Sequence, residues 1–409
     1  MSSLKPMKLN ELGFVGRGKS RHRPRNDPSL YGGPYPFFQT GDIKGANFRL
    51  TEYSQTYSDE GLAQSKLWKP GTLCITIAAN IAESAILGIE GCFPDSVVGF
   101  VADPKKADVR FIKYYMEILK LQMQSVSRGT TQDNLSLDKL LTFDFQVPPL
   151  PEQQRIAGIL SAYDELIENS QRRIRILETM ARTLYREWFV HCRFPGHETV
   201  PRIPSLLGDI PQGWEVKKLV DLSAYLNRGL SPSYDEGGAS LVINQKCVRD
   251  QRLSLEPARR QTKPIPPDKQ VRLGDVLINS TGVGTLGRVA QVYQDLDECT
   301  VDTHVTIARP NPETDLDFFG CTLLSQQEAF ERLGVGATGQ TELSRTSIAN
   351  VELVVPPADM QSRFGEAVRP MRKAVITLET QIQNLRCTRD LLLPRLLSGD
   401  AKLAMPELV

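Results

Sequence analysis

Residues 156–188 read IAGILSAYDELIENSQRRIRILETMARTLYREW, and this stretch decides the architecture. Its apolar side chains recur at alternating steps of four and three residues, which is the a/d seam of a coiled-coil helix. At ~1.5 Å per residue, about 33 helical residues make a rod on the order of 50 Å long. The seam positions are Ile156, Leu160, Tyr163, Ile167, Ser170, Ile174, Leu177, Ala181, Leu184 and Trp188.

A second seam lies 208 residues further along the chain, in register with the first. Ser170 interrupts the first copy and Arg389 the second, and Pro370 is a potential kink. One stripe could pack against its own domain, but two stripes of equal length favour burial against each other. A globular segment separates them, so we expect an antiparallel two-helix coiled coil. The second seam is Phe364, Val368, Met371, Val375, Leu378, Ile382, Leu385, Arg389, Leu392 and Leu396.

The regions between the helices repeat as well. VPPLPEQQRI begins at Val147 and its counterpart VPPADMQSRF begins at Val355, which is the same offset of 208 residues. Short β-branched runs such as LCITIA mix with Gly, Pro and Asn, which is typical of a mixed α/β domain with several short strands. We therefore expect an α/β (mixed α+β) chain with a pseudo-two-fold internal repeat, divided into globular domains at 1–150 and 209–357 and helical regions at 151–208 and 358–409.

Two nucleotide-binding patterns are present, and the residues around them argue against both. GFVGRGKS at 13–20 matches the P-loop pattern, but four prolines between Pro24 and Pro36 forbid the helix that must follow it. GVGTLG at 282–287 matches the dinucleotide-binding pattern, but β-branched residues follow it instead of a helix. We expect a loop at the first position and a turn between strands at the second.

The composition offers few residues of the kinds that commonly carry out catalysis. The chain has 409 residues, four histidines and seven scattered cysteines, so we expect no disulfide framework, no metal site and a cytoplasmic location. The segment HCRFPGH at 191–197 could offer ligands, but a turn after the helix is the simpler interpretation. We also expect no signal peptide and no membrane span.

The net charge is only +1, so a nucleic-acid surface must be local. Cations between Lys5 and Arg25 outnumber acids seven to one, and prolines hold them on an extended loop where helical i,i+4 pairing is impossible. A solvated basic loop is the alternative, but nearby amides and hydroxyls favour contacts to phosphates and base edges. The candidate DNA-contacting residues are Arg17, Lys19, Ser20, Arg21, Arg23, Arg25, Tyr31, Gln39, Thr40, Asp42, Lys44, Thr130, Gln132, Arg228, Asn244, Gln245, Lys246, Arg249, Thr338 and Gln340.

Two similar modules on an antiparallel rod match the symmetry of two half-sites along duplex DNA, where one turn is roughly 34–36 Å. The order of these parts, together with GDIPQGWEVKKL at 208–219, LYREWFVHCRFPG at 184–196 and LLLPRLLSGDAKL at 391–403, resembles the specificity subunit of type I restriction-modification systems. The resemblance covers nearly the whole chain.

The resemblance implies a non-catalytic subunit whose two target-recognition domains, 1–150 and 209–357, read the halves of an asymmetric bipartite site. It implies that the conserved helical regions set the spacing between the halves and dock two methyltransferase subunits, which carry S-adenosylmethionine. Motor-nuclease subunits using ATP and Mg would complete the complex, and no cofactor is expected in this chain. The rival interpretations are a nucleotide-dependent enzyme that uses Lys19 and a pure protein scaffold.

Overall fold

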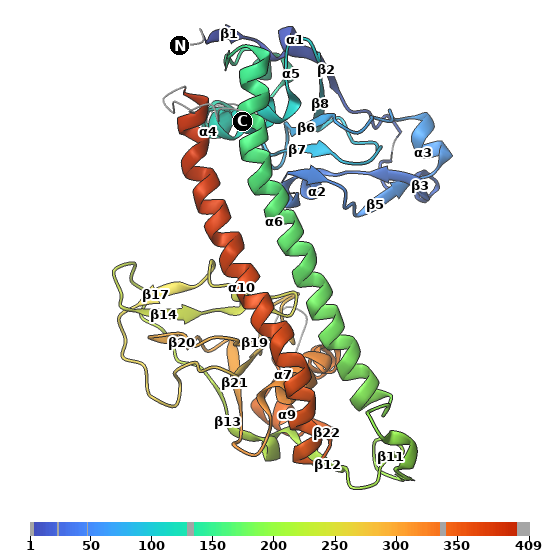
Figure 1. Ribbon diagram of the computed structural model, residues 1–409, viewed down its shortest axis with the longest axis vertical. Coiled ribbons are helices and arrows are strands. Elements are labelled where there is room, and N and C mark those ends of the chain that lie inside the picture. Colours follow the sequence, from blue (N-terminus) through green and yellow to red (C-terminus); the bar gives the residue numbers. More distant parts are fainter. Residues whose placement is uncertain (1–3, 23, 47, 129–134, 336–340, 399–409) are drawn as a thin grey trace, which may run out of the picture. The chain divides into compact units, whose positions relative to one another are not determined.

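The computed structural model describes residues 4–22, 24–46, 48–128, 135–335 and 341–398, and the chain divides into two compact units. Unit 1 comprises Met1–Ser170 with Gln381–Val409, and unit 2 comprises Gln171–Thr380. Each unit contains one of the two globular repeats and one segment from each of the two long helices, α6 and α10 (Figure 1).

Unit 1 is built around a five-stranded sheet in the order β2-β8-β6-β7-β4. Its neighbours are antiparallel except for β4 and β7, which run parallel. The elements of the first repeat are β1 Lys5–Met7, α1 Leu9–Leu12, β2 Gly13–Arg17, η1 Pro28–Leu30, β3 Tyr31–Phe37, α2 Thr40–Gly45, β4 Arg49–Leu50, β5 Gln55–Tyr57, α3 Asp59–Ala63, β6 Leu73–Thr76, β7 Ser84–Leu87, β8 Val97–Ala102, α4 Val109–Arg128, α5 Leu137–Leu140 and β9 Phe145–Val147.

Unit 2 contains a four-stranded antiparallel sheet in the order β13-β21-β18-β19 and a three-stranded sheet in the order β17-β14-β20. Its elements after α6 are η3 His197–Thr199, β10 Arg202–Ile203, β11 Ile210–Pro211, β12 Glu215–Lys218, η4 Leu219–Leu222, β13 Ser223–Arg228, β14 Ser240–Ile243, η5 Gln245–Cys247, β15 Val248–Arg249, β16 Arg252–Leu253, β17 Arg259–Gln261, β18 Val276–Asn279, β19 Val289–Gln291, β20 Cys299–Val301, β21 Val305–Pro310, α7 Leu316–Ser325, α8 Gln327–Arg332, α9 Arg345–Ala349 and β22 Glu352–Val355.

The two repeats share one topology, which confirms the internal repeat. The run β2-β8-β6-β7 of unit 1 corresponds to β13-β21-β18-β19 of unit 2, and the terminal pair β1-β9 corresponds to β12-β22. The short strand expected at LCITIA is β6, and its counterpart in the second repeat is β18; both are fully buried.

The long helices are present as expected. α6 runs from Leu150 to Tyr185 and continues into a π-helical turn, Arg186–Val190, while α10 runs from Ala358 to Leu397. α10 continues through Pro370, so this proline does not end it. None of the twenty seam residues is exposed: each is buried or half-buried. Residues 399–409 lie outside the described part of the chain.

The start of each long helix is fixed by the same pair of hydrogen bonds, because Gln153 and Gln361 occupy equivalent buried positions. The Gln153 amide donates to the Pro148 carbonyl at 3.0 Å and accepts the backbone N–H of Asp108 at 3.0 Å. The Gln361 amide makes the matching bonds to Pro356 at 2.9 Å and from Asp315 at 3.1 Å. A glutamine thus ties each helix to the α4 or α7 region of its own repeat.

The GVGTLG pattern is a turn between strands, as expected, but the loop expected at GFVGRGKS is wrong for its first five residues, which form a strand. β2 covers Gly13–Arg17, and the next helical residues in the described part of the chain are the three of η1. GVGTLG connects β18 to the antiparallel β19 as a turn with positive φ at Gly282, Gly284 and Gly287. Among the described residues, neither pattern leads directly into a helix of the kind that binds phosphate.

Candidate nucleic-acid interface

The basic loop of unit 1 leaves β2 with its backbone anchored and its side chains outward. The Gly18 N–H donates to the Val97 carbonyl at 2.8 Å, and the Lys19 N–H donates to the Phe93 carbonyl at 3.1 Å. A Cβ at Gly18 would come within 2.3 Å of the Phe93 carbonyl oxygen, so this close approach requires glycine. The loop is therefore held rigidly at the point where exposed Arg17 and Lys19 project.

The cations of this loop are not equally available. Arg25 makes a bidentate ion pair with Asp95, at 2.9 Å to each carboxylate oxygen. The expectation that the extended loop leaves its cations available for phosphates is therefore wrong for Arg25. Arg17 donates only to the backbone carbonyl of Asp95, at 3.1 Å. Within the described residues, Lys19 and Arg21 have no carboxylate partner. Arg23 lies outside the described residues.

A cation and two aromatic rings missed by the sequence analysis adjoin this loop. The Lys66 ammonium lies 3.6 Å from the ring centroid of Trp68 and 4.8 Å from that of Phe14. Partial burial and the nearby charge of Lys19 lower the pKa of Lys66. Phe14, the second residue of β2, is 56% exposed. The available sequence signal was an aromatic residue just before the basic loop that begins at Arg17.

The polar candidates of unit 1 divide between surface and structural roles. Gln39 and Lys44 are exposed at the two ends of α2, and the Lys44 ammonium lies 3.3 Å from the Asn80 side-chain oxygen. Half-buried Thr40 begins that helix. By contrast, Asp42 caps α2 by accepting the Gln39 N–H at 2.7 Å.

Two further unit 1 candidates are also partly committed to the fold. Ser20 is buried, and its hydroxyl accepts from Tyr57 at 3.4 Å, so it lies outside the exposed set. The Tyr31 hydroxyl donates to the Arg25 carbonyl at 2.6 Å. It therefore supports the basic loop from beneath.

In unit 2 the segment after β14 corresponds to the segment after β3 in unit 1, and it carries different side chains. Asn244 caps η5 by accepting the Lys246 N–H at 2.9 Å, and it donates to the Pro257 carbonyl at 2.7 Å. Lys246 and Arg249 are exposed. Arg228 is neutralised by Glu342 at 2.6 Å and donates to the Leu343 carbonyl at 3.0 Å.

Unit 2 also gathers a hydrogen-bonded group beside Gln245. The Thr281 hydroxyl lies 3.4 Å from the Gln245 side-chain oxygen and 2.7 Å from Nδ1 of the exposed His304. His304 is not among the DNA-contacting residues expected from the sequence. The same holds for the cluster Arg259, Arg260 and Lys263, which no acid interrupts between Glu256 and Asp268.

Each unit therefore brings the same two segments together. In unit 1 the segment after β3 meets the β6–β7 connection through Lys44 and Asn80, and in unit 2 the segment after β14 meets the β18–β19 connection through Gln245 and Thr281. Four candidates, Thr130, Gln132, Thr338 and Gln340, lie outside the described residues, so their place relative to these segments stays a prediction.

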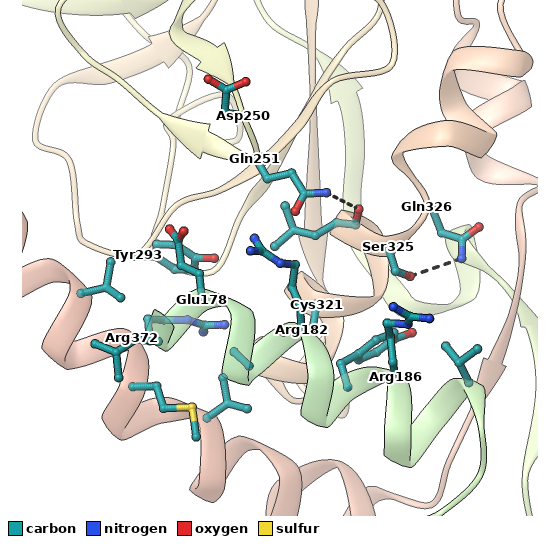
Figure 2. A pocket seen from close by; sticks show the side chains of 18 of the residues that line it. Glu178, Arg182, Arg186, Asp250, Gln251, Tyr293, Cys321, Ser325, Gln326 and Arg372 are labelled. Carbon is teal, nitrogen blue, oxygen red and sulfur yellow. Dashed lines mark hydrogen bonds between the residues drawn. The ribbon is translucent and has the colours of Figure 1, made fainter. Parts of the chain in front are cut away.

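Unit 2 contains a cavity of about 530 Å³ between α6, α7 and α10 (Figure 2). Apolar walls come from Leu177, Val368 and Met371. Arg182 lines the cavity from α6, and Arg186 lines it from the π-helical turn that follows. Burial raises the pKa of the Cys321 thiol in this cavity to about 11, so the thiol is not an activated nucleophile.

Across the described ranges, no group of three or more His, Cys, Asp and Glu residues is arranged to hold a metal ion. The HCRFPGH segment follows α6 as a turn that ends in η3, with the His197 ring nitrogen 2.8 Å from the Phe194 carbonyl oxygen. A search of the same ranges for a helix long and apolar enough to cross a membrane finds none.

Comparisons with known proteins agree with these observations. The chain is 22% identical to the type I restriction enzyme MjaIX specificity subunit of Methanocaldococcus jannaschii, over 97% of this chain and 93% of that protein. It is 22% identical to the HindI specificity subunit of Haemophilus influenzae, over 95% and 98% of the two chains. The crystal structure of the type I restriction-modification S subunit from M. genitalium shares the fold, with a TM-score of 0.60, 16% identity, and coverage of 100% of this chain and 97% of that one.

The sequence profile described as the type I restriction modification DNA specificity domain matches residues 1–179 and again 211–385. These two matches coincide with the two structural repeats and together span most of the chain. Members of this family are the non-catalytic, DNA-recognising components of their systems. The chain belongs to the family of type I restriction-modification specificity subunits.

Proposed function

We propose that each repeat reads one half of a bipartite, asymmetric DNA site, with 1–150 and 209–357 as the two target-recognition domains. The observation that carries this proposal is the shared arrangement of the two units, where equivalent segments meet but present different side chains. In unit 1 the exposed groups are Arg17, Lys19 and Arg21, whereas unit 2 offers Lys246 and His304. Unlike side chains on a common scaffold predict unlike half-sites.

The helical regions 151–208 and 358–409 hold the reading domains in this proposal, with α6 and α10 paired as an antiparallel coiled coil. Contacts inside each unit support that direction. In unit 1 Arg389 forms an ion pair with Asp164, and in unit 2 the Phe364 ring lies 5.0 Å from the Phe189 ring and 6.0 Å from the Tyr185 ring. Positions later in α6 thus meet positions earlier in α10.

Partner subunits supply the chemistry in this proposal. Two methyltransferase subunits that carry S-adenosylmethionine dock on the helical regions, and motor-nuclease subunits bring ATP and Mg, while this chain holds no cofactor. Exposed apolar side chains on the helices, including Leu166, Ile176, Met180 and Leu391, support docking there because such residues commonly mark interaction surfaces. In this proposal, double-stranded DNA is the ligand that this chain shares with its partner subunits. The complex is expected in the cytoplasm, where it meets that DNA.

Exchanging residues 1–150 for those of a relative tests the reading role. Mapping methylated adenines in cells that carry the chimaera and the methyltransferase should show one half-site changed and the other retained. Unchanged methylation sites would instead favour the scaffold interpretation. ATP binding by the purified chain that disappears with Lys19→Ala would favour the enzyme interpretation, and we expect no such binding.

Substitution of single cations sorts base contacts from phosphate contacts. Removing an arginine that reads a base should cost about 1–3 kcal/mol at one position of the site only. Removing a phosphate contact should weaken binding to all sequences alike and reduce the salt dependence. We apply this test to Arg17, Lys19, Arg21, Arg23 and Arg25.

A further inference from the structure

A buried polar cluster in unit 1 joins three elements. The Asp164 carboxylate on α6 accepts a hydrogen bond from the Tyr114 hydroxyl on α4 and forms an ion pair with Arg389 on α10. The Asp164 side chain is only 2% exposed and that of Arg389 is 21% exposed. One carboxylate therefore ties the globular repeat and both long helices together.

Arg389 stands where the heptad pattern calls for an apolar residue. Its neighbours in the seam, Leu385 and Leu392, are apolar, and the equivalent position in α6 is Ala181. A charged side chain in an apolar seam lowers the stability of a coiled coil. Polar seam residues in known coiled coils specify the register and orientation of the helices at this cost. The departure from the pattern thus coincides with the cluster.

The contacts of this cluster depend strongly on the register of α10 against α6. If α10 slid by one heptad along α6, Ile382 or Leu396 would lie opposite Asp164. The carboxylate would then be buried without its cation, which is strongly destabilising. The apolar seam residues impose no comparable penalty, because leucine and isoleucine can exchange places with modest loss.

Unit 2 does not repeat this ion pair at the equivalent positions. The residue 208 positions after Asp164 is Arg372, and it pairs with Asp317 on α7 instead of with α6. Arg369 pairs with the same carboxylate at 3.0 Å. Among the ion pairs of the described residues of unit 2, none joins α6 to α10. Among the described residues, the ion pair between the two helices is therefore found in unit 1.

We propose that Tyr114, Asp164 and Arg389 are positioning residues that fix the register of α10 against α6. On the proposed function, on which this part rests, that register sets the distance between the two half-sites. A slip of one heptad moves α10 by about 10.5 Å, at 1.5 Å per residue. This movement corresponds to roughly three base pairs at 3.4 Å each.

The test replaces the cluster by apolar residues of similar size, in the variant Tyr114→Phe/Asp164→Leu/Arg389→Leu. Register is measured on the full-length chain, without DNA, as the electron paramagnetic resonance distance between two nitroxide labels. One label sits on Cys387, the only exposed cysteine, and the other on Leu166→Cys of α6. Both sites lie in unit 1.

We expect one narrow distance in the parent chain and an additional population, displaced along the helix by about 10 Å, in the triple variant. Arg389→Lys keeps the charge and should keep the single distance. Arg386→Leu removes an exposed charge one turn away and serves as the matched control. Should the triple variant not fold, Asp164→Asn/Arg389→Gln removes both charges while leaving a partner for Tyr114, and it should also populate the displaced distance.

A single parental distance in the folded apolar variant, or in the Asn/Gln variant if the former does not fold, would overturn the proposal, since the apolar contacts alone would then fix register. Methylation mapping with the methyltransferase present gives the second readout. Relaxed register predicts a minor class of sites whose spacing differs by about three base pairs. Absence of bipartite methylation in the parent would sink the proposed function and leave the distance result standing.

Discussion

Substitution of Lys19 by Gln removes one exposed cation from the unit 1 loop without disturbing its backbone. The loop is held at this residue by main-chain bonds, from the Lys19 N–H to the Phe93 carbonyl and from the Ser65 hydroxyl to the Lys19 carbonyl at 2.8 Å. No described carboxylate neutralises the ammonium group. The change should therefore act on DNA affinity and leave folding unchanged.

The size of the effect follows from counterion release. One phosphate contact contributes about 0.9 to the slope of log K against log salt, so its loss weakens binding about fivefold at 0.15 M salt and less than twofold at 0.5 M. Asp95→Asn should act in the opposite direction, because it removes an acid and releases Arg25 from its bidentate ion pair. It should tighten binding and steepen the slope.

Fluorescence anisotropy with a labelled duplex, across a series of salt concentrations, measures both changes. The duplex need not contain the target, because the phosphate contribution is independent of sequence. Glu313→Gln, on the exposed surface of unit 2, is the control for a change of one formal charge elsewhere. A slope that stays at the parental value in Lys19→Gln would refute the assignment of this loop to the DNA backbone.

Three further predictions concern the chain itself. Asp275→Asn should destabilise unit 2 by about 3–5 kcal/mol in urea unfolding, because the fully buried Asp275 carboxylate pairs with Arg309 at 2.8 Å and its loss leaves that cation buried; exposed Asp297→Asn should change little. Burial raises the pKa of Asp302, so the folded state binds that proton more tightly than the unfolded state and stability should fall as pH rises from the ordinary value of 3.8 through the raised folded value. Asp302→Asn should remove this loss, and an unchanged pH profile of the urea midpoint would contradict it. A thiol reagent added to the native chain should modify one cysteine quickly, Cys387, because the other six are buried; two or more fast thiols would show that a buried site opens.

The long helices were predictable because their pattern is local and repeated. Twenty seam positions spaced by three and four residues predict helices, and every one of these residues is buried or half-buried in the structure. The same pattern carries no information about polar residues beside the seam. Asp164 looks like an ordinary surface acid in the sequence, and only the packing of α4 and α10 makes it a buried partner.

The candidate interface was predictable in part, at the level of segments. The sequence indicated the basic loop and the segments after β3 and β14. It could not show which of their side chains are engaged in contacts within the fold. Arg25 is paired with Asp95, 70 residues away, and Arg228 with Glu342, more than 110 residues away. Such pairs depend on long-range loop packing, which leaves no periodic trace in a single sequence.

The divergence of the two loops that follow β2 and β13 has a physical consequence for recognition. The first carries Lys19 and Arg25 where the aligned positions of the second carry Leu230 and Glu236. Unit 2 compensates elsewhere, with exposed cations on and after β17. Under the proposed function, positive charge determines where the phosphate backbone lies, so we expect the two repeats to hold DNA through different parts of one scaffold. The internal symmetry governs the framework of the fold, and we expect the loops that depart from it to set the orientation of DNA on each domain.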